Sequence, residues 1–304
     1  MKILVTGATG YLGSGIVRAL VEAGHEVAGL TRLAENAAYL QALGANAVVG
    51  DLRQPATYRH AADSADALIH AAQEDSPARQ AADRMAVEAL IEAARNGRAR
   101  VLVYTSGCFV LGETGEEPVG EEASTESAPP YAAWRREQEQ RILAAGDRGL
   151  ATAVIRPGMV YGGKEGAFAS FFATAERDGA AEFIGDGTNH WSPVYRGDMA
   201  RLYRQVVERE GRGIFHCAER AARVGDLAIA ASRAAGAGGA TRRRRLEEAR
   251  KELGDFADAL TLDQLMGCPR ARAFGWVPEH PHFLEGGAVQ AFSEWKEPNR
   301  PSGS

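Results

Sequence analysis

The sequence predicts an α/β protein built on a doubly wound parallel sheet, followed by a smaller C-terminal lobe. The first observation is an apolar run at residues 2–5 that leads through closely spaced glycines into a helical pattern. The second is the alternation of short apolar runs with helical stretches over residues 1–107. The third is the return of similar runs at residues 153–163 and 213–219. Strands that alternate with helices run parallel, because each helix carries the chain back by a right-handed crossover.

The composition is that of a globular protein without a nucleic-acid partner. The 304 residues are 45% hydrophobic and 25% charged, which suffices for one large domain or two smaller ones. The formal net charge of -5 leaves no basic excess to displace counterions from phosphates. We therefore expect no nucleic-acid partner.

The cysteines and the apolar runs indicate a cytoplasmic protein. Cys108, Cys217 and Cys268 are odd in number and widely separated, so they form neither a disulfide framework nor a metal-binding motif. The first apolar run ends at Thr6 and Gly7, too early for a secretory leader. No run approaches the roughly 20 apolar residues of a membrane span. We expect no membrane partner, no bound metal and a reducing cytoplasm.

The first turn of the chain predicts a dinucleotide site. Gly7, Gly10 and Gly13 lie between the strand at 2–5 and a helix at 14–23, in which apolar residues recur at helical spacing. Glycine permits positive φ in the turn, lets a pyrophosphate approach the backbone, and lets the helix pack close to the strand. The helix N-terminus then offers unpaired N–H groups to the anion. The alternative is an ordinary strand–turn–helix with incidental glycines.

The next strands indicate which dinucleotide binds. The expected elements are strands at residues 25–32, 46–52, 66–72 and 100–107, and a helix at 77–95. An NAD enzyme usually ends its second strand with a carboxylate for the ribose 2′-hydroxyl. This chain has Thr31 and Arg32 there, which suits a 2′-phosphate, so we expect NADP(H) in preference to NAD(H). The alternative is that Arg32 is an exposed side chain without a role.

Several motifs occur in an order that resembles the extended short-chain dehydrogenase/reductase family, which includes NAD-dependent epimerases and dehydratases. They are G-x-x-G-x-x-G after Thr6, Asp51-Leu52, HAA at 70–72, RPGMVYGG at 156–163 and FGWVP at 274–278. The resemblance covers about residues 1–290 and implies a Rossmann-type dinucleotide-binding core over residues 1–160. It also implies a mainly substrate-binding lobe over 161–296, of which about 190–220 return to the core. We expect residues 297–304 to form a disordered tail.

The same resemblance assigns the cofactor contacts. They would come from Gly7, Thr9, Gly10, Tyr11, Leu12, Gly13, Thr31, Arg32, Asp51, Leu52, Ala72, Tyr131, Arg135 and Pro157. In relatives the Asp-Leu pair meets the adenine, and the backbone after the arginine of the Arg-Pro segment meets the nicotinamide carboxamide.

The catalytic residues of the family are only partly matched. Its members use a Tyr that moves a proton, a Lys four residues later that grips the nicotinamide ribose, and a Ser or Thr that holds the carbonyl oxygen. Here Tyr131 is followed by Trp134 and Arg135, where the family has Ser and Lys. Residues four apart share a helix face, so the Arg135 head can lie near the phenol, bind ribose hydroxyls and favour the ionised phenol. Arginine cannot relay a proton as lysine does. The alternative is that Tyr131 is a surface or lid tyrosine.

The hydroxyl position of the family is also altered. It corresponds to Gly107, with Ser106 and Cys108 on either side. Neighbouring strand residues face opposite ways, so Ser106 fills the role only if the strand end turns it inward. Ser106 is the third catalytic candidate, and a role elsewhere is the alternative.

Three features of the second half also bear on function. Met159 occupies the place where sugar-nucleotide epimerases often carry Asn, which weakens the case for a nucleotide-sugar substrate. Asp198 is expected to cap the helix that follows it. The four arginines at 242–245 are expected to begin a solvated helix.

These observations favour an NADP(H)-dependent oxidoreductase, a carbonyl reductase or alcohol dehydrogenase that acts on a small organic molecule. A second hypothesis is an epimerase or dehydratase that keeps its cofactor bound through turnover. A third is a non-catalytic, NmrA-like protein that senses the dinucleotide. The resemblance also implies a homodimer formed through helices, one of them at 131–143.

Overall fold

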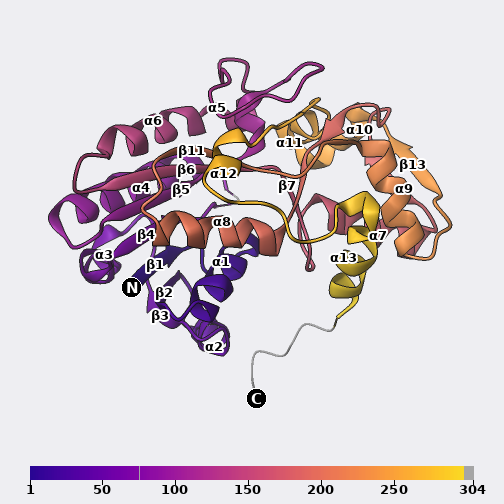
Figure 1. The fold of residues 1–304 in the computed structure, drawn as a ribbon. Coiled ribbons are helices and arrows are strands. Elements are labelled where there is room, and N and C mark those ends of the chain that lie inside the picture. The colour runs from indigo at the N-terminus through magenta and orange to yellow at the C-terminus, as the bar shows by residue number, and fades with distance from the viewer. Residues whose placement is uncertain (75, 298–304) are drawn as a thin grey trace.

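A seven-stranded parallel sheet forms the centre of the computed structural model, which describes residues 1–74 and 76–297 (Figure 1). The strand order is β11-β6-β5-β4-β1-β2-β3. The strands are β1 (Lys2–Thr6), β2 (Glu26–Thr31), β3 (Asn46–Val49), β4 (Ala67–His70), β5 (Val101–Thr105), β6 (Ala151–Pro157) and β11 (Gly213–Cys217). The chain runs from β1 outward to β3, returns to β4 and continues to the opposite edge, so the order reverses between β1 and β4. The doubly wound α/β prediction is confirmed.

Helices cover both faces of this sheet. Those of the core are α1 (Tyr11–Glu22), α2 (Ala37–Ala42), α3 (Arg59–Ser64), α4 (Arg79–Asn96), α5 (Pro130–Ala133), α6 (Arg135–Ala145) and α8 (Arg196–Glu208). The alternation of side chains along β1 shows the two faces: Ile3 and Val5 belong to the hydrophobic cluster beneath α1 and α8. Leu4 belongs to the cluster beneath α4 and α6. Because both faces are covered, the central strands β1, β4 and β5 are largely apolar and almost wholly buried.

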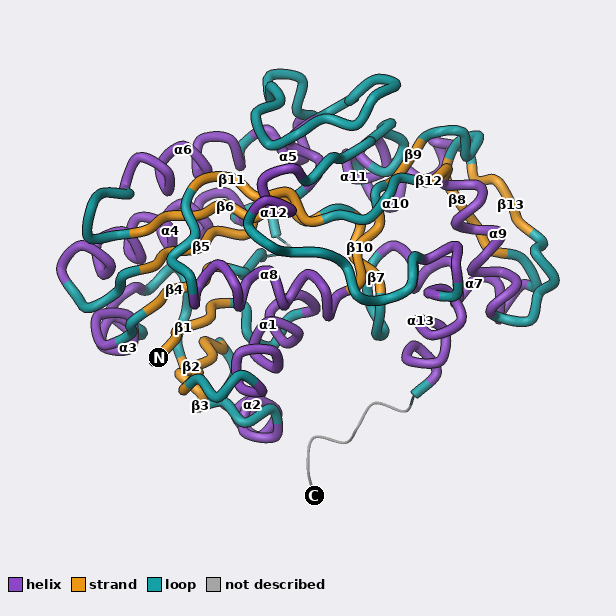
Figure 2. Tube along the Cα trace, in the orientation of Figure 1, coloured by secondary structure: helices purple, strands orange, loops and turns teal. Residues whose placement is uncertain are grey.

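A second lobe begins where β6 ends. β7 (Met159–Tyr161) leaves the main sheet and pairs with β10 (Pro193–Tyr195), and the turn between β6 and β7 requires Gly158 because a Cβ there would lie 2.1 Å from the carbonyl oxygen of Ser192. The other strands of the lobe are β8 (Ala181–Ile184), β9 (His190–Trp191), β12 (Ala222–Arg223) and β13 (Thr241–Arg244). Its helices are α7 (Ala167–Asp178), α9 (Val224–Ala234), α10 (Leu246–Leu253), α11 (Asp255–Ala259) and α13 (Gly287–Lys296). Helix α12 (Pro269–Ala273) returns to the core and packs on β11. Figure 2 shows most of these short strands and helices on the side away from β2 and β3.

The prediction that Asp198 caps the following helix is wrong. Helix α8 begins at Arg196, so Asp198 lies inside the first turn, and its carboxylate makes no capping hydrogen bond. It instead accepts hydrogen bonds from the backbone N–H groups of Glu279 and His280, at 3.2 and 3.1 Å, and pairs with Arg201 at 2.7 Å. Asp198 therefore fastens the C-terminal segment of the chain to the core.

The arginine run does not begin a helix. Thr241–Arg244 forms β13, which pairs in parallel with β8, and the helix α10 starts only at Leu246. Arg242 pairs with Asp178 and with Glu182, both at 2.8 Å. Acidic partners on the neighbouring elements thus hold the arginines on a sheet edge, and a local helical pattern carries no information about such partners.

Two expectations concern features outside this core. Among the helices of residues 1–74 and 76–297, none has the length and apolar character needed to cross a bilayer. The tail predicted at residues 297–304 lies, apart from Glu297, outside the described residues.

Candidate active site

The glycine turn forms a cradle of bare backbone at the carboxyl end of β1. Gly7 has a φ of +69°, and a Cβ there would lie 2.6 Å from the Cα of Ala72. A Cβ on Gly13 would lie only 2.0 Å from the carbonyl oxygen of Gly7. A Cβ on Gly10 would meet only that same oxygen, at 3.3 Å. Gly7 and Gly13 therefore shape the turn, while Gly10 leaves its outer side open to a ligand, as a pyrophosphate requires.

Tyr11 and Leu12 begin the helix that follows the turn. The Tyr11 hydroxyl donates a hydrogen bond to the carbonyl oxygen of Gly162 at 2.8 Å, and the guanidinium of Arg196 lies over its ring. Burial raises the pKa of Tyr11, so the phenol stays protonated as this donor. Leu12 packs against the hydrophobic core. Tyr11 thus links the glycine turn to the start of the second lobe.

A cleft of about 170 Å³ opens beside the glycine turn. It is lined by Gly7, Thr9, Gly10, Leu30, Thr31, Arg32, Gly50, Leu52, Ala71, Ala72, Gln73 and Glu74. These residues come from the carboxyl ends of β1, β2, β3 and β4, where open α/β sheets bind ligands. The cleft brings together seven of the predicted cofactor residues. Because the cradle would be filled by a single Cβ, the residues present fit a nicotinamide dinucleotide.

The far end of this cleft carries a cluster of charges. Arg32 Nη1 lies 3.5 Å from Glu74 Oε1, and Arg53 Nη2 lies 3.0 Å from Asp51 Oδ2. Hydrogen bonds from Arg53 lower the pKa of Asp51. Neither Arg53 nor Glu74 was found from the sequence, because nothing in the local pattern shows that the ends of β2, β3 and β4 meet.

Arg135 is anchored at the carboxyl ends of β4 and β5. Trp134 separates α5 from α6, so the predicted single helix is two short helices at this point. Arg135 Nη1 donates to the Tyr104 hydroxyl at 3.1 Å and to the Thr105 carbonyl at 3.0 Å. Its Nη2 donates to the side-chain oxygen of Gln73, which lines the cleft. Arg135 therefore reaches the cofactor cleft, and no hydrogen bond among the described residues joins it to the Tyr131 phenol.

A buried polar chain lies behind this arginine. The Tyr104 hydroxyl donates to Asp83 at 3.2 Å, and Asp83 contacts His70 Nε2, also at 3.2 Å. His70 Nδ1 lies 2.6 Å from the Thr6 hydroxyl, next to the glycine turn. All four side chains are buried. Burial raises the pKa of Tyr104, so its hydroxyl keeps the proton that it donates. Asp83 supplies a buried negative charge behind the half-buried guanidinium of Arg135.

Tyr131 lies in an aromatic environment contributed by both lobes. Its ring is 5.9 Å from that of Phe109, in an edge-to-face arrangement, and 5.0 Å from that of Phe256 on α11. The guanidinium of Arg79, at the start of α4, lies 4.8 Å from the ring centre. The phenol is thus held between the strand-end segment and the second lobe.

Ser106 and its neighbour Gly107 define the space at the end of β5. The Ser106 hydroxyl is buried and finds no hydrogen-bond partner among the described residues. A Cβ on Gly107 would meet nothing within 4 Å, so the position of the family hydroxyl is open space. Met159 is buried, with its sulfur 3.9 Å from that of Cys108. Pro157, the last residue of β6, is buried at the same edge of the sheet.

A second buried carboxyl group lies in the lobe. Glu219 Oε1 accepts hydrogen bonds from the Tyr161 hydroxyl at 2.9 Å and from the Tyr195 N–H at 3.1 Å. Glu219 Oε2 is buried without a hydrogen-bond partner among the described residues, and His282 Nε2 is 4.0 Å away. Burial raises the pKa of Glu219 from 4.5 to about 7. The sequence offered no sign of this group.

This carboxyl group should make stability depend on pH. The folded protein binds the Glu219 proton more tightly than the unfolded chain, so the contribution to stability is complete below about pH 4.5 and is lost as pH rises through about 7. We expect the free energy of unfolding of the wild type to fall by ~3 kcal/mol between these pH values because of Glu219. In Glu219→Gln this fall should be absent, because glutamine does not titrate. Urea titrations across this range measure it. The exposed Glu285→Gln variant is the matched control, and an unchanged pH profile in Glu219→Gln would contradict the prediction.

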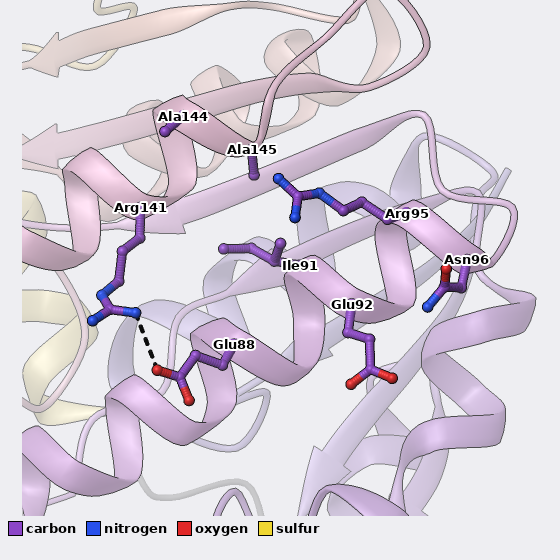
Figure 3. Close-up of a pocket in the computed structure, with 8 residues that line it drawn as sticks. All are labelled: Glu88, Ile91, Glu92, Arg95, Asn96, Arg141, Ala144 and Ala145. Carbon is purple, nitrogen blue, oxygen red and sulfur yellow. Dashed lines mark hydrogen bonds and ion pairs between the residues drawn. The ribbon is translucent and has the colours of Figure 1, made fainter.

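A larger hollow of about 590 Å³ lies between α4 and α6, away from the cofactor cleft (Figure 3). Its lining includes Glu88, Glu92, Arg95 and Arg141, and Arg141 pairs with Glu88 at 3.1 Å. None of the predicted site residues lines it. It also shares no lining residue with the cleft beside the glycine turn, so it has no part in the site described above.

The fold and the cradle at its switch point define the class: an NAD(P)-binding enzyme of the extended short-chain dehydrogenase/reductase type. The chain belongs to the NAD dependent epimerase/dehydratase family, whose model matches residues 3–218. This bears out the family resemblance and the prediction of an enzyme.

Individual relatives resemble most of the chain. It is 33% identical over 309 residues to the uncharacterized protein C2A9.02 of Schizosaccharomyces pombe, covering 96% of this chain and 100% of the relative. It is 34% identical over 222 residues to a 2-alkyl-3-oxoalkanoate reductase of Stenotrophomonas maltophilia, covering 68% and 66%. Among solved structures, a double mutant of the Streptomyces venezuelae dTDP-glucose 4,6-dehydratase with bound NAD superposes with a TM-score of 0.82 at 22% identity, covering 98% and 97%. That likeness shows the shared fold.

Proposed function

We propose that the protein is an NADP(H)-dependent reductase of a carbonyl group on a small organic molecule. The observation that carries this proposal is the position of Arg135. Its guanidinium donates a hydrogen bond to Gln73, which lines the cofactor cleft. Tyr131 lies four residues before it, and Ser106 directly follows the strand whose last carbonyl Arg135 binds. Ser106 and Arg135 thus meet at the carboxyl end of β5, and the proposal assigns the proton to Tyr131 on the neighbouring helix.

Each residue then has a defined task. The N–H groups of the glycine turn would hold the pyrophosphate, and Arg135 would hold hydroxyls of the nicotinamide ribose. Reduced nicotinamide, when bound, supplies a hydride. The Ser106 hydroxyl donates a hydrogen bond to the carbonyl oxygen of the substrate, and the Tyr131 hydroxyl gives that oxygen a proton. The guanidinium charge of Arg135, which makes no hydrogen bond to Tyr131 among the described residues, would stabilise the phenolate through space until solvent returns the proton.

The surroundings of Tyr131 favour this reaction over sugar epimerisation. Phe109 and Phe256 flank the phenol, and Met159 packs against Cys108 where a sugar-nucleotide enzyme often carries Asn. A ketone with apolar substituents suits such a site, and the relative named as a 2-alkyl-3-oxoalkanoate reductase supports it. An epimerase or dehydratase that retains its cofactor is the second candidate, favoured by the family model.

The test is direct. Thermal-shift measurements with NAD+, NADH, NADP+ and NADPH identify the dinucleotide, and a panel of 3-oxo acids and ketones is then tested for consumption of the reduced form. We expect the largest shift with NADPH and net oxidation of NADPH by at least one ketone. A dinucleotide that copurifies, with turnover but no net change in its redox state, would instead establish the second candidate. Stabilisation by NADPH without any turnover would favour the sensor.

Ser106 and Gly107 provide a sharper test of the active site. We expect Ser106→Ala to lower kcat about 100-fold, because the carbonyl oxygen loses a hydrogen-bond donor. Adding Gly107→Ser to that variant should restore kcat to within about tenfold of the wild type, since a side chain at 107 meets open space. Steady-state kinetics measure both. An unaltered kcat in Ser106→Ala would remove Ser106 from the mechanism.

The homodimer remains a prediction. It would use α4 and α6, whose outer surface carries Glu88, Glu92, Arg95 and Arg141 around the hollow of Figure 3. Such a surface favours ion pairs across an interface, so the dimer would weaken as salt screens them.

A further inference from the structure

A buried carboxylate lies between two exposed arginines at the far end of the cofactor cleft. Glu74 Oε1 is 3.5 Å from Arg32 Nη1 and 3.6 Å from Arg53 Nε. The Glu74 side chain is 6% exposed, whereas those of Arg32 and Arg53 are 60% and 48% exposed. The Ser76 hydroxyl donates to Glu74 Oε2 at 3.2 Å and fixes the carboxylate. The anion is thus buried and hydrogen-bonded, whereas the two cations beside it are exposed to solvent.

The pairing of these charges is loose. Charge-assisted hydrogen bonds between nitrogen and oxygen are usually about 2.7–2.9 Å long, so both contacts to Glu74 are longer than a tight ion pair. Arg53 has a closer partner in Asp51, at 3.0 Å. Two guanidinium groups and two carboxylates give this end of the cleft no net charge. Arg32 alone would favour a 2′-phosphate, but Glu74 and Asp51 oppose its charge and that of Arg53.

We propose that Glu74 is a specificity-determining residue that competes with the 2′-phosphate of NADP(H) for Arg32 and Arg53. The proposal rests on the proposed NADP(H) dependence. A bound 2′-phosphate would draw both exposed guanidinium groups away from Glu74, and the fixed carboxylate would repel it. NAD(H) has no phosphate there and leaves the arginines on Glu74. The preference for NADP(H) is then smaller than two arginines alone would give.

A carboxylate at this position could instead bind the ribose hydroxyls, and its removal would then affect NADH binding. A carboxylate that accepts hydrogen bonds from the ribose hydroxyls favours NAD(H), as the acidic residue at the end of the second strand does in many dinucleotide sites. Removing such a carboxylate weakens NADH binding. The two roles are therefore separated by which cofactor responds.

Isothermal titration calorimetry on the full chain, with NADPH and NADH as the probes, tests the proposal. We expect Glu74→Gln to lower the Kd for NADPH about tenfold and to change the Kd for NADH less than about twofold, since only NADPH carries a 2′-phosphate next to the removed charge. Arg53→Ala should raise the Kd for NADPH about tenfold and spare NADH. The effect of Glu74→Gln should shrink between about 0.05 M and 0.5 M salt, because ions screen the exposed arginines and the 2′-phosphate with which Glu74 interacts.

The controls keep the outcomes separate. Glu92→Gln removes an exposed carboxylate on α4 and should alter neither Kd. The melting temperature of each variant without cofactor shows that it folds. Weaker NADH binding in Glu74→Gln, or an unchanged Kd for NADPH, would overturn the proposal. Failure of the wild type to bind either dinucleotide would instead overturn the proposed function itself.

Discussion

Replacing Tyr131 by phenylalanine is expected to lower kcat about 1,000-fold, because the reaction loses the group that protonates the carbonyl oxygen. The ring contacts with Phe109 and Phe256 are kept in this variant, so the fold and the KM for the dinucleotide should not change. Single-turnover kinetics with NADPH and the best ketone measure the loss. Activity within about tenfold of the wild type would show that Tyr131 is not the proton donor.

A second tyrosine serves as the matched control for this experiment. The Tyr195 hydroxyl donates to Glu294 at 2.6 Å in the second lobe, and its ring stacks on His280. Tyr195→Phe removes one hydroxyl and one hydrogen bond, so we expect a lower melting temperature with kcat near that of the wild type. The two variants together separate a loss of chemistry from a loss of stability.

Replacing Gly13 by alanine is expected to have the largest effect on cofactor binding. The added Cβ would lie 2.0 Å from the carbonyl oxygen of Gly7, which is backbone and cannot turn aside. The turn must then move away from α1, which should destabilise the fold by ~3 kcal/mol. A cradle displaced by about an ångström should bind NADPH about 100-fold more weakly. Urea unfolding and calorimetry measure the two effects.

Two neighbouring glycines give the controls. A Cβ on Gly15, in the same helix, would meet only the flexible side chain of Arg196, so Gly15→Ala should fold as well as the wild type or better. A Cβ on Gly10 would meet only the oxygen of Gly7 at 3.3 Å, so Gly10→Ala should keep most of the stability and still obstruct the pyrophosphate. Tight NADPH binding by Gly13→Ala would show that the phosphates lie elsewhere.

The strands and the glycine turn could be predicted because local patterns decide them. Residues 3–5 and 101–104 are apolar runs, which are typical of strands buried on both faces. Gly7 and Gly13 occur where a strand must give way to a closely packed helix, and the structure shows backbone within 2.7 Å of where their Cβ atoms would lie. The arginines of β13 were misassigned because their acidic partners come from distant parts of the chain.

The hydrogen-bond partners of Arg135 could not be predicted from the local sequence pattern. Its spacing from Tyr131 predicted a shared helix face, yet Trp134 divides that helix and the guanidinium bonds to Tyr104 and Gln73. The sequence does contain one indication of the buried polar chain behind Arg135. Asp83 is a charged residue among the apolar positions of a helix. Such a residue is buried only when it has partners, and naming them requires the third dimension.

A doubly wound sheet, a glycine cradle at its first turn and the family of the chain could all be predicted from local sequence patterns. These follow from the spacing of glycines and apolar residues, which acts over a few positions. The pairing of the charged side chains, in contrast, depends on the tertiary structure. Arg32 shares Glu74 with Arg53, and Arg135 is tied to β4 and β5 rather than to Tyr131. Electrostatic interactions act through space, so they depend on which strand ends lie side by side.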